Sequence, residues 1–244
     1  MKIAASSAAF ERALAAGDLT QLEWLDLCAS ELEADGVLFD IRHFPRTDAD
    51  YLAQLKKMAA DLGLTVAGLS ASTPDTADIQ TALALGAPLL VISAPAAPGQ
   101  AEAWNDFLAT MRPLAAAAKR ANVTLALRNA PKTLCETVAD CKRATKDVDS
   151  AWLRYALDVA ALEASESSGT LNLKAVLAIH RITDLETFAR DATEARTIVN
   201  ALRGFRGFVA IEHRDANAER TAYHRAMRTL RAASAQAALE TSDG

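Results

Sequence analysis

Residues 36–70 read GVLFDIRHFPRTDADYLAQLKKMAADLGLTVAGLS, and their pattern decides the fold. The stretch opens and closes with short apolar runs, GVLFD and LTVAGLS, which have the length and composition of buried strands. Between these runs, Leu52, Leu55 and Met58 recur at helical spacing, and Gly63 is a typical helix stop. The stretch therefore predicts a strand, a helix and a second strand in succession, which is the unit that joins parallel strands.

The same alternation runs along the whole chain. The apolar runs of strand length are KIAAS (2–6), GVLFD (36–40), LTVAGLS (64–70), PLLVIS (88–93), VTLALR (123–128), LRYALD (153–158), VLAIH (176–180) and GFVAIE (207–212). Helical patterns separate most of them. Two of these helices are expected to open with capping boxes, Thr20 with Glu23 and Thr133 with Glu136.

Eight strand–helix units in 244 residues predict one α/β domain over residues 1–244, a single parallel (β/α)8 barrel of the TIM type. The sixth connection, VAALEASESSGTLNLK, is short and polar, so a shortened sixth helix is expected there, and a frayed tail is expected from about 236 to 244. An open doubly wound sheet is the alternative. The sequence has no G-x-G-x-x-G after its first strand and no P-loop, which favours the barrel.

Composition limits the classes of function. The formal net charge of -5 disfavours a non-specific nucleic-acid binder, and no apolar run reaches membrane-spanning length. The cysteines (Cys28, Cys135 and Cys141) form no C-x-x-C motif, which indicates buried or free thiols rather than a disulfide framework or zinc site. The start, MKIAASSAAF, does not resemble a signal peptide. A cytoplasmic protein with no membrane or nucleic-acid partner is expected.

Polar side chains end each of the last four predicted strands. These residues are Arg128, Asp158, His180 and Glu212, and an alanine lies two positions before each. Side chains alternate faces along a strand, so the alanines and the polar ends are expected to face the barrel axis together. Active sites of such barrels lie at the carboxyl ends of the strands. Arg181 competes with His180 for the inward position; if Arg181 faces inward, the preferred ligand becomes more acidic.

Further candidates follow other strands. Asp40 and Arg42 follow the second strand, and Asn129 follows the fifth. Together with Asp158 they are the expected substrate-binding residues. The hydroxyl groups of Ser70, Ser72 and Ser93, at the ends of the third and fourth strands, could bind a polyol. No nucleophile has an identifiable base partner, so a hydrolase triad is unsupported.

Three segments carry a resemblance to a known family. ADGVLFDIR (34–42), LALGAPLLVIS (83–93) and PLAAAAKRANVTLALRN (113–129) are similar to the second strand, the fourth strand and the approach to the fifth strand of the xylose-isomerase-like TIM barrels. That family contains sugar isomerases and epimerases and, more distantly, DNA-repair enzymes of the endonuclease IV type. The resemblance implies an isomerase or epimerase that acts on a small hydroxy-carbonyl compound, a polyol or sugar-like ligand.

The resemblance also implies a divalent metal held by two glutamates, one aspartate and one histidine. Asp158, His180 and Glu212 match three of these ligands, but Arg128 stands where the first glutamate belongs, and Ala161 replaces a histidine that follows the sixth strand. A guanidinium is permanently charged and repels a metal ion. We therefore expect no metal cofactor and predict that Arg128 occupies the metal's place, paired with Asp158, Glu212 or both.

The expected catalytic residues are Glu212, Arg128 and His180. If a metal ion were retained, Mn, Mg or Co would be held by Asp158, His180 and Glu212, because oxygen ligands with one imidazole suit these ions. The alternative function is a non-catalytic small-molecule binder or sensor on the same barrel that has lost the metal. A third reading, endonuclease-like chemistry, is disfavoured by the acidic charge. The alanine-rich outer helices are compatible with a homodimer.

Overall fold

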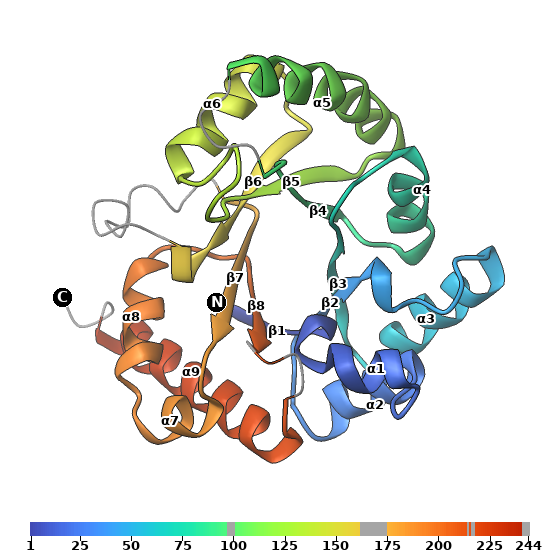
Figure 1. Ribbon diagram of the computed structural model, residues 1–244. Helices are drawn as coiled ribbons and strands as arrows, with labels where there is room; N and C mark the ends of the chain where they lie inside the picture. Colours follow the sequence, from blue (N-terminus) through green and yellow to red (C-terminus); the bar gives the residue numbers. More distant parts are fainter. Residues whose placement is uncertain (97–100, 162–174, 214, 216–217, 241–244) are drawn as a thin grey trace.

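Eight parallel strands form a closed barrel in which each strand pairs with the next and β8 pairs with β1 (Figure 1). The structure is a computed structural model that describes residues 1–96, 101–161, 175–213, 215 and 218–240. The strands are β1 (Lys2–Ser6), β2 (Gly36–Asp40), β3 (Thr65–Ala71), β4 (Leu89–Ser93), β5 (Thr124–Arg128), β6 (Leu153–Asp158), β7 (Leu177–Ile182) and β8 (Phe208–His213). The predicted (β/α)8 architecture is confirmed.

Helices surround the ring of strands, as Figure 1 shows in a view along the barrel. They are α1 (Glu11–Ala16), α2 (Gln21–Ser30), α3 (Ala49–Asp61), α4 (Thr76–Leu85), α5 (Ala101–Ala121), α6 (Val138–Val148), α7 (Leu185–Arg190), α8 (Thr193–Ala201) and α9 (Arg220–Glu240), with 3-10 turns η1 (Ser7–Phe10), η2 (Ile41–His43) and η3 (Val159–Ala161). Among the described residues, no helix combines the length and hydropathy needed to span a bilayer.

The helix boundaries follow local chemistry. The capping box of Thr20 and Glu23 opens α2 as predicted, and Gly86 ends α4 in the left-handed conformation that glycine adopts without steric cost. The predicted capping box of α6 is wrong. The side chain of Thr137 caps this helix together with Asp140, and Thr133 lies in the preceding loop. Both pairs have the same spacing, so spacing alone does not choose between them.

Two other predictions concern the sixth connection and the C-terminal tail. The described start of the sixth connection is the single turn η3, and residues 162–174, where the shortened helix was expected, lie outside the described residues. The frayed tail was placed too early, because α9 continues to Glu240. Residues 241–244 lie outside the described residues.

The buried core has two parts. The larger part packs the outer faces of the strands against the helices. The smaller part fills the barrel interior with one or two side chains from each strand: Ala4, Leu38, Ala67, Val91, Ala126, Ala156, Leu177, Ile179 and Ala210. The inward alanines predicted on β5, β6 and β8 are confirmed. On β7 the prediction is wrong by one residue, since Ile179 faces inward and Ala178 packs against the helices.

Candidate active site at the barrel mouth

A ring of polar side chains lies one layer above the apolar interior, at the carboxyl ends of the strands. Because side chains alternate along a strand, the position two residues beyond the inward core residue also faces the axis on every strand except β3, where the pairing with β2 shifts by one residue. On β3 the inward position is Ser70, which follows the outward Leu69. The ring consists of Ser6, Asp40, Ser70, Ser93, Arg128, Asp158, Arg181 and Glu212.

Arg128 binds two carboxylates, Asp158 on the neighbouring strand β6 and Glu212 on β8. Its Nε and Nη2 donate to Asp158 Oδ2 at 2.9 and 2.6 Å. Its Nη1 and Nη2 donate to Glu212 Oε1 and Oε2, each at 3.1 Å. The three side chains are 11%, 11% and 7% exposed, so the ion pairs are nearly dry. The predicted pairing of Arg128 is therefore found with both carboxylates.

A second arginine reaches the same cluster from β7. Arg181 donates from Nε and Nη2 to Glu212 Oε2 at 3.2 and 2.9 Å, and its side chain is 52% exposed. The prediction that His180 joins the cluster is wrong. His180 points outward, where Nε2 lies 2.8 Å from Glu194 Oε1 on α8 and the ring lies beside Phe188 of α7. The one-residue shift of β7 exchanges the two side chains.

The electrostatics of the cluster favour its charged form. Burial works against the charge on Arg128, but Glu212 and Asp158 outweigh this effect and raise the pKa of the guanidinium above its usual value. Burial also works against the charge on Glu212 and would raise its pKa, but Arg128 and Arg181 outweigh burial and lower that pKa. A carboxylate held in this way stays ionised at neutral pH and is a weakened base.

Two of the remaining candidates form their own pair. Asp40 accepts from Arg42 Nε at 3.0 and 3.1 Å and from Nη2 at 2.7 Å, and Arg42 also contacts Glu11 at 3.5 Å. Ser7 Oγ accepts from the backbone of Asp40 and lies 3.0 Å from His43 Nδ1, so it fixes the end of β2. Arg42 is half-exposed and remains available at the mouth.

The expected substrate-binding role of Asn129 does not fit its position. The side chain is fully buried and joins β5 to β6, because Oδ1 accepts from the backbone N–H of Asp158 at 2.8 Å and Nδ2 donates to the carbonyl at 3.4 Å. Asn129 therefore positions Asp158 rather than facing a ligand. Its place after a strand end could not distinguish these roles.

The sequence profile of the xylose isomerase-like TIM barrels matches residues 27–233. The chain belongs to this family. A search of curated protein sequences finds no match.

Solved structures related to this xylose isomerase-like barrel include sugar epimerases. An L-ribulose 3-epimerase superposes with a TM-score of 0.75 at 18% identity, covering 98% of this chain and 97% of its own. The D-psicose 3-epimerase of Clostridium cellulolyticum H10, solved with D-tagatose, gives 0.73 at 17% identity, covering 96% and 98%. The IOLI protein, solved with a bound zinc atom, gives 0.71 at 16% identity, covering 97% and 99%. At these identities the likeness establishes the fold alone.

The residues of this xylose isomerase-like barrel do not fit the divalent metal that the resemblance implies. Only Asp158 and Glu212 of the expected ligands face the axis, and a guanidinium already occupies their oxygens. His180 is turned away toward α8. In the described part of the chain, no three His, Cys, Asp or Glu side chains are grouped closely enough to hold a metal ion.

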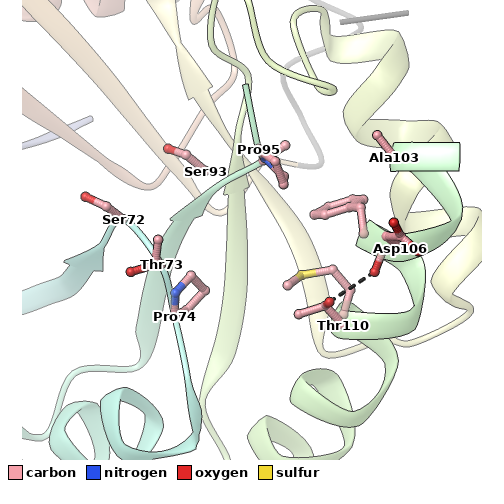
Figure 2. Close-up of a pocket in the computed structure, with 11 residues that line it drawn as sticks. Ser72, Thr73, Pro74, Ser93, Pro95, Ala103, Asp106 and Thr110 are labelled. Carbon is pink, nitrogen blue, oxygen red and sulfur yellow. Dashed lines mark hydrogen bonds between the residues drawn. The ribbon is translucent and has the colours of Figure 1, made fainter. Parts of the chain in front are cut away.

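One cavity reaches the ring at Ser93, and a second lies near Arg42 without touching a ring residue. The first, of about 460 Å³, lies between the ends of β3 and β4 and the first turns of α5. Figure 2 shows Thr73 and Pro74 on one side of it and Asp106 and Thr110 on the other. The other, of about 550 Å³, lies beside η2 and is lined in part by Arg42. Neither cavity is lined by Arg128, Asp158, Arg181 or Glu212.

Proposed function

We propose that this protein binds a small hydroxy-carbonyl compound, a polyol or sugar-like molecule, at the barrel mouth and acts on it as an isomerase or epimerase without a divalent metal. The observation that carries this proposal is the guanidinium of Arg128 between Asp158 and Glu212. A fixed cation at this point can stabilise negative charge that develops on a substrate oxygen, the role that the resemblance assigns to the metal.

The donors of Arg128 support such a role. A guanidinium has five N–H donors, and the hydrogen bonds to Asp158 and Glu212 use four of them, which leaves one on Nη1. In this proposal that donor binds the substrate oxygen, and Glu212 accepts the proton from the neighbouring carbon. Because Arg128 and Arg181 weaken Glu212 as a base, we expect slow turnover.

Binding without turnover is the second candidate. It is favoured by a specific feature: each inward carboxylate of the ring is paired with an arginine, Asp40 with Arg42, and Asp158 and Glu212 with Arg128. No carboxylate of the described ring is free to take a proton. In this case the barrel would serve as a sensor or carrier for the same class of compound.

Proton exchange in heavy water distinguishes these functions. EDTA-treated protein is incubated with a panel of ketoses and aldoses in D2O, and NMR measures deuterium at the carbon beside the carbonyl. We expect slow incorporation that survives EDTA and falls at least about tenfold in Arg128→Met, the loss expected for one charged stabilising group. Arg196→Gln, on exposed α8, is the matched control.

Two other outcomes of the exchange experiment would not support a metal-free isomerase. Saturable binding with no deuterium incorporation supports the non-catalytic binder. Incorporation that appears only after a divalent ion is added contradicts the assigned role of Arg128.

A further inference from the structure

Arg181 is the ring residue whose position differs most from what the sequence predicts. The inward Ile179 places Arg181 toward the axis, and Cα pairing sets it opposite Glu212 on β8. Nε and Nη2 both donate to the same oxygen, Glu212 Oε2. These contacts fix the plane of the guanidinium and leave its other edge unused.

The side chain of Arg181 is half-exposed. In the described part of the chain, Nη1 of Arg181 makes no hydrogen bond, and 52% of the side chain is exposed. Arg128 is 11% exposed and has four hydrogen bonds, and Arg42 is shared between Asp40 and Glu11. Arg42 and Arg181 are both half-exposed, but in the described part of the chain Arg181 is the one that faces the axis, pairs with a single carboxylate and keeps Nη1 without a hydrogen bond.

The charge of the mouth limits the ligand that this edge can take. Three arginines at the described mouth, Arg42, Arg128 and Arg181, pair with the three ring carboxylates Asp40, Asp158 and Glu212, so the charges of this group cancel. Glu11, which is 3.5 Å from Arg42, adds one negative charge at its edge. Without Arg181 the group would carry a net negative charge and repel any anion. With Arg181 it is neutral, so one negative charge is tolerated better than the two of a phosphate.

We infer that Arg181 binds the carboxylate of the substrate, so that the preferred compounds are sugar acids rather than neutral sugars or sugar phosphates. The planar guanidinium edge matches a carboxylate. Ser70 and Ser93, at the ends of β3 and β4, add hydroxyl groups to the same ring for a polyol ligand. This inference rests on the proposed function, because it assumes that the ligand lies at the barrel mouth.

Matched ligands test the inference. Calorimetry measures the binding of D-glucose, D-glucuronate and D-glucose 6-phosphate, and of the corresponding D-galactose series, to the full chain. We expect the uronates to bind about tenfold or more tightly than the neutral sugars, as a charge-assisted hydrogen bond allows. The preference should weaken as salt is raised, because Arg181 is half-exposed.

Variants separate the role of Arg181 from a general effect of charge. Arg181→Gln should remove the preference for uronates, Arg181→Lys should keep part of it, and Arg196→Gln, which removes the same charge from exposed α8, should keep it whole. Circular dichroism spectra of the variants confirm folding.

Some results would contradict the inference about Arg181 alone, and one would also contradict the proposed function. Neutral sugars that bind as tightly as uronates, a preference that survives in Arg181→Gln, or tighter binding of the phosphates overturns the inference and leaves the role of Arg128 untouched. Binding of none of these ligands contradicts both the inference and the proposed function.

Discussion

Arg128 combines two properties that a lysine would not supply. Its planar fork reaches two carboxylates on different strands at once, and its charge is permanent. Removing either carboxylate leaves part of a buried cation uncompensated, which is more costly than losing a surface ion pair. The cluster is therefore a structural element of the mouth as well as its candidate site.

The acid side of the stability profile should reflect Glu212. Its folded-state pKa is lowered, so its ionised form adds stability that is present above the unfolded pKa and is lost as pH falls through the folded pKa. Glu212→Gln should lower the free energy of unfolding at pH 7 by about 3 kcal/mol, the lower end for a broken buried pair, because Arg128 keeps Asp158. Urea denaturation measures this loss.

The pH dependence of this loss of stability tests whether Glu212 is ionised. The difference between wild type and Glu212→Gln should shrink as pH falls below the ordinary pKa of a glutamate, because the unfolded chain then takes up a proton while the lowered pKa keeps Glu212 ionised in the folded protein. A difference that stays constant or grows toward low pH would contradict the assignment of an ionised Glu212.

The strand β7 shows why the sequence predicted the barrel but not all of its mouth. Both faces of a barrel strand are buried, so the residues of VLAIHRI are mostly apolar on either face. No alternation of polar and apolar residues therefore shows which face of β7 points toward the axis. On β5, β6 and β8 the predicted inward residues Arg128, Asp158 and Glu212 are correct.

The choice between His180 and Arg181 depends on contacts far along the chain. Arg181 donates hydrogen bonds to Glu212 on β8, and His180 lies within hydrogen-bond distance of Glu194 on α8. Neither partner is visible from the local pattern. The same cause explains Asn129. The sequence predicts a ligand-binding side chain, but its partner is the backbone of Asp158 on another strand, which the local pattern does not show.

The register of β7 makes a direct prediction for His180. His180→Gln should cost about 1 kcal/mol of unfolding free energy, the value of one hydrogen bond to half-exposed Glu194. Ligand binding at the mouth should be unchanged, because the side chain lies on the outer face of the barrel. Thermal denaturation and calorimetry measure the two effects. Loss of binding with normal stability would show that His180 faces the mouth.

The closed barrel brings together residues that are distant in sequence. Arg128 and Glu212 are 84 residues apart, yet parallel strands of equal direction put their ends at one mouth. The same scaffold can therefore hold a metal or an arginine according to a few side chains on strand ends. The central claim is that a guanidinium has taken the metal's place in this chain.

Titration with manganese tests that claim most directly. At about 4 Å and an effective dielectric of about 20, each unit of like charge costs roughly 4 kcal/mol, and a divalent ion meets about twice that beside Arg128. Wild type should therefore show no saturable binding of Mn²⁺ by calorimetry. Arg128→Glu with Arg181→His, which places a carboxylate and an imidazole at inward positions, should bind about one ion per chain. Tight stoichiometric binding by wild type that is lost in Asp158→Asn would contradict the account.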